Sequence, residues 1–329
     1  MEGRTPVGWD LPSDIARVPS DVPYQPALMR ALKEGRALRR CLGEAARLGA
    51  PFDLVHTGHL PAPAGLPVPY TLTVHDLRSL DFRGTSLARR AVGRRTLDSA
   101  VTRAQRVLCV SDAVRARIAE EFPTAASRLD LIGNGEDHLR LLPRAPSSSP
   151  FMLHVGHLEP RKNLALIIEA MDRYPALPRL VLAGAAKGDS APRLLAVAEH
   201  RGLASKIEML GTVSDEELAR LYSTAACAVF PSVLEGFGIG PAEALRAGCP
   251  VAASAIPAHL EVSGDGATFF SPADPDEVAR AIMECVAVSA IAHPPGHPPD
   301  HPPGHEHRWE DCAGRWFEAL MRASLDAPG

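Results

Sequence analysis

Short apolar runs alternate with helical segments along residues 151–288, and this alternation constrains the fold more than any other feature of the chain. The runs that have the character of buried strands are 151–156, 179–184, 207–211, 227–230, 250–254 and 267–270. The predicted helices that follow them are 163–173, 190–201, 214–224, 241–248 and 274–288. Strands that alternate with helices form a parallel, doubly wound sheet. We therefore predict an α/β domain over residues 151–290.

Local signals mark where several of these helices begin and end. The run Ser214-Asp-Glu-Glu217 matches a capping box. Pro241 fits the first turn of its helix, and Gly248 fits the end of the same helix. Asn163 is expected to cap the helix that follows it.

The run Asp274-Pro-Asp276 formally matches an acidic D-x-D metal motif. With Glu277 it also makes a complete helix start, because it places an aspartate at the N-cap, a proline at the first position and a glutamate at the third. We therefore predict a helix start here and no metal site.

The first half of the chain carries the same alternation less clearly. Its predicted strands are 53–56, 70–75, 106–111 and 129–135, the last of which ends in a turn. Its predicted helices are 27–48, 86–104 and 112–121, and Ser111 or Asp112 can cap the last of them. Residues 5–26 show no period and are expected to be irregular. A segment rich in Pro and Ser at 143–150 separates this N-terminal domain, 1–145, from the second domain.

Two segments follow the second domain. Residues 291–307 are a Pro/His-rich linker, whose histidines are at 293, 297, 301, 305 and 307. Proline excludes a helix here, and a spacing of four in an extended chain does not gather the imidazoles on one face, so a connector is favoured over a metal site. Residues 308–329 contain a predicted helix, 308–324, with apolar anchors at Trp309, Trp316, Phe317 and Leu320.

Charge and composition exclude several classes of protein. The formal net charge of −4 argues against a general nucleic-acid-binding polycation. No apolar run reaches the ~18 residues of a membrane span, and the first residues lack the apolar region of a signal peptide. The six cysteines are scattered without a C-x-x-C pair, which predicts reduced thiols and a cytoplasmic protein. Peripheral membrane contact and the oligomeric state stay open.

The most informative motif is Glu235-Gly-Phe-Gly-Ile-Gly-Pro-Ala-Glu243. It places two carboxylates on either side of a glycine-rich turn, with the second near the start of a helix. Glycines let a backbone approach a ligand, helix N-termini offer free N–H donors, and a carboxylate accepts hydrogen bonds from the hydroxyls of a sugar or ribose. An ordinary strand-to-helix loop, with acids that favour the helix dipole, is an equally open interpretation.

A second motif, Gly156-His-Leu-Glu-Pro-Arg161-Lys162-Asn163, places two adjacent cations just before a helix. Helix N–H groups together with Arg and Lys can clamp a diphosphate. A solvated basic pair is the alternative. Cations at this end oppose the helix dipole, which favours an anionic ligand beside them.

Together these motifs resemble the retaining glycosyltransferases of family 4, the mannosyltransferase-like group that has the GT-B fold. The pattern G-x-L-x-x-R-K-N precedes E-G-F-G-x-x-x-x-E-A-L-x-x-G-x-P-V, and the segments 182–184, 210–218 and 229–232 between them also match. The resemblance covers roughly residues 53–288 and resumes at 308–323. It implies two Rossmann-like domains with parallel sheets that face across a cleft. It also implies a hexosyltransferase that uses a nucleoside diphosphate sugar and needs no metal or other cofactor.

The resemblance further implies roles for single residues. Arg161 and Lys162 would hold the diphosphate and stabilise its charge as it leaves, which fits the need for preorganised cations at a developing anion. Glu235 would face the donor sugar near its reacting carbon, and Glu243 would bind the ribose hydroxyls. His75 would approach the sugar and its phosphate from the N-terminal domain. The other donor contacts would come from Gly156, Gly236, Phe237, Gly238 and Ile239.

The turn Gly133-Asn-Gly135, followed by Glu136 and Asp137, matches the N-G-x-D turn of the same family. A purely structural role for this turn is the simpler interpretation.

The front of the chain departs from the family pattern. Family members begin with a strand, a G-G-x-x-x turn and two more strands, whereas the residues before Asp53 show no such pattern, and Gly3 and Gly8 are poor substitutes. We therefore expect a shortened N-terminal domain. Two alternatives stay open: a non-catalytic nucleotide-sugar-binding subunit of a complex, and a GT-B epimerase or phosphorylase. The acceptor could be a glycan, a lipid or a small molecule, and nucleic acid is not expected.

Overall fold

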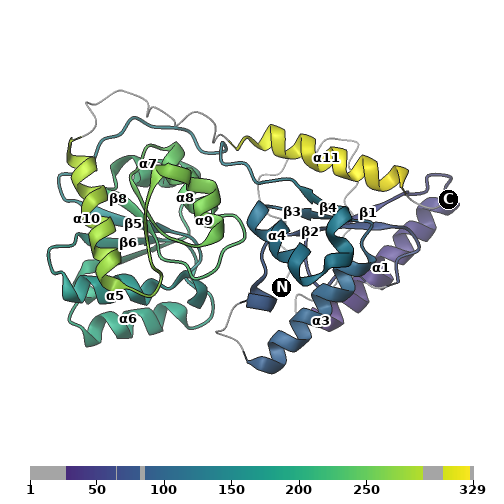
Figure 1. The fold of residues 1–329 in the computed structure, drawn as a ribbon, viewed down its shortest axis with the longest axis horizontal. Helices are drawn as coiled ribbons and strands as arrows, with labels where there is room; N and C mark the ends of the chain where they lie inside the picture. Colours follow the sequence, from purple (N-terminus) through teal and green to yellow (C-terminus); the bar gives the residue numbers. More distant parts are fainter. Residues whose placement is uncertain (1–26, 64, 82–85, 292–306, 327–329) are drawn as a thin grey trace.

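The computed structural model describes residues 27–63, 65–81, 86–291 and 307–326. They form two units, each a parallel β-sheet flanked by helices, and a last helix that returns to the first unit (Figure 1). The α/β class with two Rossmann-like units, predicted from the alternation and the motifs, is confirmed. The predicted irregular segment at 5–26 and most of the Pro/His repeat lie outside the described residues.

The N-terminal sheet has the strand order β1-β2-β3-β4, and all neighbours are parallel. Its strands are β1 (Val55–Thr57), β2 (Tyr70–Val74), β3 (Arg106–Cys109) and β4 (Leu129–Leu131). Its helices are α1 (Ala27–Arg47), α2 (Arg78–Asp81), α3 (Leu87–Arg103) and α4 (Asp112–Glu121), and a 3-10 turn, Pro123–Arg128, precedes β4. Within the described residues the strand order of this sheet never reverses. The strands β1 and β4 are shorter than the sequence predicts, because each predicted run continues into a loop.

The C-terminal sheet has the strand order β10-β9-β8-β5-β6-β7 and is also fully parallel. Its strands are β5 (Phe151–Val155), β6 (Arg179–Ala183), β7 (Ile207–Gly211), β8 (Cys227–Phe230), β9 (Val251–Ser254) and β10 (Ala267–Phe270). Its helices are α5 (Leu164–Arg173), α6 (Ser190–His200), α7 (Asp215–Thr224), α8 (Ile239–Arg246), α9 (Pro257–Ser263) and α10 (Pro275–Ile291). The chain enters at the centre, fills one side and then crosses to the other, which is a doubly wound topology.

Most predicted helix signals have the expected geometry. The hydroxyl of Ser111 accepts a hydrogen bond from Val114 N, and that of Ser214 accepts one from Glu217 N. The helix cap predicted at Asn163 is wrong. Its backbone is left-handed, with φ of 55°, and its Nδ2 donates to Pro272 O at 2.9 Å instead of capping α5. A side-chain cap needs an extended backbone at that position, and the left-handed turn removes it.

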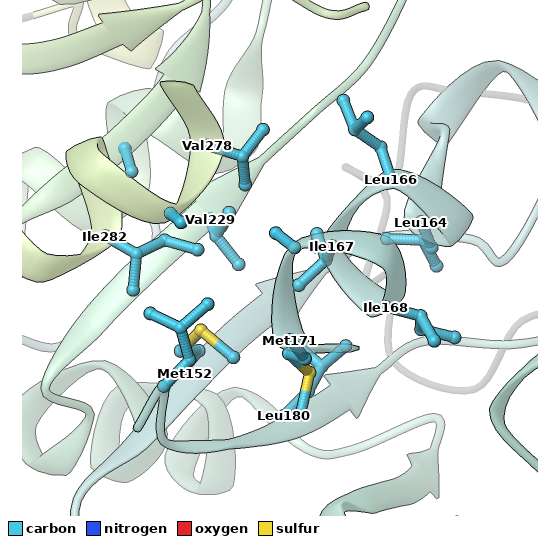
Figure 2. Close-up of a cluster of buried hydrophobic side chains, with 14 of the residues drawn as sticks. Met152, Leu164, Leu166, Ile167, Ile168, Met171, Leu180, Val229, Val278 and Ile282 are labelled. Carbon is cyan, nitrogen blue, oxygen red and sulfur yellow. The ribbon is translucent and has the colours of Figure 1, made fainter. Parts of the chain in front are cut away.

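One face of the C-terminal sheet packs its core against the helices α5 and α10 (Figure 2), and the other face packs a second core against α7 and α8. Ile167 and Met171 of α5 pack against Met152 and Leu180 of the central strands, and Ile282 of α10 joins the same cluster. All of these side chains are fully buried. The dense core fixes the positions of the loops that follow the strands.

The last helix, α11 (Trp309–Leu325), lies on the N-terminal sheet, in yellow above β3 and β4 in Figure 1. Ala319 packs on Leu108 and Ile132, and Arg322 pairs with Asp130 at 3.1 Å. The predicted anchors are partly wrong, because Phe317 is 60% and Trp309 45% exposed. The buried residues of the helix are the small Cys312, Ala319 and Ala323, and the partly buried ring of Trp316 packs beside Ala319.

Two helices are absent from the sequence prediction: the single turn α2 and the seven-residue α9. Both are too short to establish a helical period. None of the helices in the described part of the chain combines the length and apolar character that a bilayer crossing requires.

Candidate functional site

The two sequence motifs meet because strands β5 and β8 are neighbours in the C-terminal sheet. Strands β6 and β7 lie on one side of this pair and β9 and β10 on the other, so the strand order reverses between β5 and β8. In an open parallel sheet, ligands bind at the carboxyl ends of the strands that flank such a reversal. Residues 156–163 follow β5 and residues 231–238 follow β8, so the fold brings both motifs to this point.

Glu235 is the centre of the site, and both predicted cations bind its carboxylate. Lys162 Nζ donates to Oε1 at 2.7 Å, and Arg161 donates to Oε2. Ser232 Oγ also donates to Oε1, at 2.7 Å. Burial alone would raise the pKa of Glu235, but the positive charges of Lys162 and Arg161 outweigh it and lower the pKa to about 2. The carboxylate is therefore ionised at neutral pH.

Arg161 is itself held in place by three groups. Its Nε donates to Glu159 Oε1 at 2.7 Å, and its Nη1 donates to Leu234 O at 3.0 Å as well as to Glu235. Glu159 also pairs with Lys187 at 3.4 Å and with Arg78 of the N-terminal unit at 3.4 Å. Charges from both units therefore fix the guanidinium beside Glu235.

A buried polar network supports the loop behind Glu235. Ser254 Oγ donates to Ser232 O at 2.6 Å, and the ring of His259 lies 3.1 Å from the Ser254 oxygens. Desolvation lowers the pKa of His259 to about 4 and that of His154 to about 3. Both rings are therefore neutral at physiological pH, and they add no charge behind the carboxylate.

Glu243, near the middle of α8, is buried eight residues beyond Glu235. Tyr222 Oη donates to its Oε2 at 3.0 Å, and His138 Nε2 lies 3.4 Å from its Oε1. Burial raises the pKa of Glu243 to about 7, against the opposing hydrogen bond from Tyr222. Unlike Glu235, this carboxyl pairs with no Lys or Arg side chain among the described residues, so it is only partly ionised near neutral pH.

The glycine-rich loop contacts the N-terminal unit directly. A Cβ added to Gly236 would lie 1.6 Å from the backbone oxygen of His75, so only glycine fits at this approach. Ser111 Oγ donates to Gly236 O at 2.5 Å from the other side. Gly238 has φ of 98°, a conformation that side chains rarely adopt, and it ends the loop just before Ile239 opens α8.

Two other predicted donor contacts have different surroundings. The ring of Phe237 is buried in a cluster that contains N-terminal side chains and stacks edge-on against His307 at 5.2 Å. The ring therefore packs between the units and does not face the charged cluster at Glu235. Gly156 lies beside the cation pair, because a Cβ there would be 3.3 Å from Lys162 Nζ.

His75 follows β2 at the carboxyl edge of the N-terminal sheet, and its side chain is exposed. A Cβ on Gly58 would lie 3.8 Å from its Nε2. Desolvation lowers the pKa of His75, against the opposing charge of Asp76. The backbone of His75 thus touches the glycine-rich loop at Gly236, while its ring lies on the side of Gly58.

The turn at residues 133–137 receives the C-terminal segment. Asp137 Oδ1 accepts from Trp309 N at 2.8 Å, which with other nearby groups lowers the pKa of Asp137, and Glu136 N donates to His307 O at 2.8 Å. A Cβ on Gly135 would collide with Trp309. This geometry gives the turn a structural role.

The aspartates of the D-x-D run act as the helix start predicts. Asp274 Oδ1 accepts from Asp276 N at 2.9 Å and from Glu277 N at 3.3 Å. Among the described residues no group of three or more His, Cys, Asp or Glu side chains could hold a metal ion.

Sequence reasoning missed one bridge between the units. The carboxylate of Glu261 in α9 accepts from Asp112 N at 2.7 Å and from Ala113 N at 2.8 Å. It thereby occupies the N-terminus of α4 from the opposite unit, where a negative charge favours the helix dipole. No sequence signal could have paired residues 149 positions apart. The supporting roles of Ser232 and Tyr222 were missed for the same reason.

Two facing α/β units, with the charged residues at the switch point of one sheet, define the GT-B class of glycosyltransferases. A family model described as "Glycosyl transferases group 1" matches residues 142–289, and one described as "Glycosyltransferase Family 4" matches residues 5–140. The chain belongs to this family of group 1, family 4 glycosyltransferases.

Curated relatives agree with this assignment. The O-antigen chain mannosyltransferase RfbU of Salmonella typhimurium is 32% identical over 64% of this chain and 59% of that protein. O-antigen chain mannosyltransferase B of Escherichia coli is 30% identical over 58% of this chain and 54% of that protein. The matched part of the chain therefore spans between half and two thirds of these relatives.

The fold itself is shared with more distant structures. Sucrose-phosphate synthase from Thermosynechococcus elongatus has a TM-score of 0.65 at 20% identity, over 89% of this chain and 77% of that one. Anabaena HepE, solved in complex with UDP and glucose, has a TM-score of 0.62 at 18% identity, over 86% of this chain and 82% of that one.

Proposed function

We propose that this protein transfers a hexosyl group from a nucleoside diphosphate sugar to an acceptor hydroxyl, with retention at the anomeric carbon. The observation that carries the proposal is the cluster of Glu235, Arg161 and Lys162 at the switch point of the C-terminal sheet. The mannosyltransferases among the relatives favour mannose as the transferred sugar. The protein acts without a metal ion or other cofactor, because the cations of the chain take the place of one at the diphosphate.

The diphosphate binds to Arg161 and Lys162. In the unliganded site Arg161, Lys162, Lys187 and Arg78 pair with Glu235, Glu159 and Asp76. The four cations outnumber the three carboxylates, so a positive charge remains for an anionic ligand. The free N–H groups at the start of α8 and the backbone of the glycine-rich loop add neutral donors. These groups are fixed before the ligand arrives and stabilise the negative charge that grows on the leaving oxygens.

The ribose binds to Glu243. An ionised carboxylate can accept hydrogen bonds from two neighbouring hydroxyls, and Tyr222 Oη holds this one in orientation. Donation by the ribose favours the charged form, so donor binding drives Glu243 to lose its proton near neutral pH.

Glu235 and His75 interact with the sugar that is transferred. Breaking the bond between the anomeric carbon and the diphosphate leaves positive charge on the sugar ring, and the ionised Glu235 stabilises it. The lowered pKa of His75 keeps its ring neutral, which allows a hydrogen bond to a sugar hydroxyl or phosphate oxygen without adding charge. The new bond to the acceptor oxygen forms on the face that the diphosphate leaves, and the proton of the acceptor hydroxyl passes to the leaving diphosphate oxygen.

The test is turnover of GDP-mannose, UDP-glucose and UDP-N-acetylglucosamine, followed by nucleotide release, with NMR of the product anomer. We expect Glu235→Gln and Lys162→Ala to lower kcat/KM at least a hundredfold, which equals about 2.7 kcal/mol. The matched control is Lys206→Ala, which should keep the wild-type rate. Within the described residues, the Lys206 ammonium bonds the carbonyls of Pro175 and Leu177, far from Glu235 in the chain. Unchanged turnover in both site variants would refute the site assignment, and an inverted product would refute retention.

A further inference from the structure

Helix α11 packs one face on the N-terminal sheet and lies along the outer edge of that unit (Figure 1). Its opposite face carries large apolar side chains that are open to solvent. Phe317 is 60% exposed, Met321 47% and Leu325 79%. Because these three residues recur every four positions, they lie on one side of the helix and form an apolar stripe, which we call the α11 stripe.

No other helix in the described part of the chain carries such a stripe. Where another helix exposes two large apolar side chains, they are five positions apart, as are Leu87 and Val92 on α3 and Met283 and Val288 on α10. A spacing of five places the two side chains on different sides of a helix. Single exposed apolar residues are ordinary on a protein surface, whereas a contiguous apolar patch marks an interaction surface.

One border of the α11 stripe carries charges of alternating sign, in the order Asp311, Arg315, Glu318 and Arg322. Their spacing of four, three and four residues keeps them along one side of the helix. Asp311 and Glu318 are exposed and join no salt bridge among the described residues. Arg315 and Arg322 bond the N-terminal unit through one nitrogen each, so both guanidinium groups keep further N–H donors.

This order of charges is complementary to itself when a second α11 runs antiparallel to the first. A twofold axis across the two helices reverses the order of the charges and keeps them on the same side. Asp311 then faces Arg322 of the second copy, and Arg315 faces its Glu318. In a parallel pair the charged border would instead face the other border of the stripe, where Trp309 and Leu320 lie, and the charges would lose water without gaining partners.

The apolar part of the stripe also suits an antiparallel pair. Phe317 is at the middle of α11, whose ends are Trp309 and Leu325. When two antiparallel copies are centred there, Ala313 lies opposite Met321 of the second copy, so a small side chain meets a large one. A Cβ added to Gly314 would meet nothing within 4 Å, so the backbone beside Phe317 is open to a close approach.

We propose that the α11 stripe is a dimer interface, in which α11 packs antiparallel against α11 of a second copy of this chain about a twofold axis at Phe317. The interface is isologous, because the same patch serves both copies. A helix of 17 residues supplies less than the ~800 Å² per partner that a stable interface buries, so the dimer is weak, with a Kd of about 1–100 µM. The inference does not depend on the proposed function.

The first experiment measures the dimer Kd of the full chain by sedimentation equilibrium. We expect Phe317→Asp to raise the Kd at least a hundredfold, because it places two carboxylates against each other at the twofold axis. Asp311→Arg should raise the Kd at least tenfold, because it sets a second cation opposite Arg322. Both side chains are exposed, so both variants should unfold at the wild-type temperature. Val92→Asp, which changes a 65% exposed residue of α3, is the matched control and should keep the wild-type Kd.

The second experiment tests the direction of the helices by disulfide formation. Ala313→Cys and Met321→Cys, mixed under mild oxidation, should form a disulfide with each other. Neither should form one with itself, because eight residues place a site about 12 Å along the axis from its own counterpart. The wild-type protein is the control, since five of its six cysteines are buried.

Four results would overturn the proposal. They are a monomer at every concentration up to about ten times the expected Kd, a wild-type Kd in Phe317→Asp, disulfides of each cysteine variant with itself in place of mixed ones, and a monomer that binds phosphatidylglycerol vesicles through Phe317. The last result would assign the α11 stripe to a lipid surface.

Discussion

The backbone oxygen of His75 in the N-terminal unit closes against Gly236 of the C-terminal unit so tightly that a side chain on this glycine would overlap it. The contact joins the end of β2 to the loop that carries Glu235. The two halves of the site are thus held in register by backbone atoms, which move less than side chains do.

We predict that Gly236→Ala lowers donor turnover at least tenfold, or about 1.4 kcal/mol in the barrier, because the added Cβ would lie 1.6 Å from His75 O and must push the units apart. The control is Gly314→Ala in α11, where nothing lies within 4 Å of the added atom. That change should stabilise the helix by up to about 1 kcal/mol. Steady-state kinetics and thermal unfolding of both variants check the pair. Full activity of Gly236→Ala would mean that the contact between Gly236 and His75 does not fix the positions of the site residues.

The lowered pKa of Glu235 predicts a loss of stability in acid. The folded pKa of about 2 lies below the unfolded value near 4.5, so its contribution is present above pH 4.5 and is lost as the pH falls toward 2. We expect the free energy of unfolding of wild type to exceed that of Glu235→Gln at pH 6, because the variant leaves the partly buried Lys162 without a carboxylate partner and leaves Arg161 with Glu159 alone. The difference should shrink steadily between pH 4.5 and 3 in urea titrations. A difference that stays constant with pH would contradict the ion-pair account.

The raised pKa of Glu243 predicts that donor affinity depends on pH. If the ribose binds the ionised carboxylate, affinity for UDP-glucose or GDP-mannose rises between pH 5 and 8 and levels off above the pKa of about 7. At the acidic end, the affinity for the nucleotide sugar can change by about tenfold per pH unit. Glu243→Gln should bind more weakly at pH 8 and lose this dependence. Calorimetric titrations across the range measure both, and a parallel slope in the variant would assign the effect to another group.

The negative charge of Glu261 is predicted to stabilise the N-terminus of α4, with which its carboxylate forms hydrogen bonds. Glu261→Gln keeps an acceptor oxygen but removes the negative charge at the helix N-terminus, which is worth about 0.3–1 kcal/mol. We expect faster amide hydrogen exchange at Asp112 and Ala113 and a higher donor KM. The control is Glu310→Gln, an exposed acid in the first turn of α11. Equal exchange rates in wild type and Glu261→Gln would show that the bridge does not hold the units together.

The fold of the C-terminal unit could be predicted closely from local patterns. The strands are short and bounded by polar turns, and the inner strands β5, β6, β8 and β9 are largely buried. Ser214 and Asp274 form the hydrogen bonds that their spacing predicts. Asn163 shows where local reasoning fails. The same residue type serves as a cap or in a left-handed turn, and the contact with Pro272, 109 residues away, decides between them. The exposed Phe317 is a similar case, because the neighbouring sheet selects which face of α11 is buried.

The sequence by itself determined the class of fold, the family and the residues that form the candidate donor site, because strand alternation, helix caps and the two motifs are local in the chain. Only the tertiary structure decided the partners of those residues. It joined Glu235 to Lys162 by making β5 and β8 neighbours, and it gave the two glutamates of one motif opposite pKa shifts. Charge and burial depend on what packs around a group, and those neighbours come from distant parts of the chain.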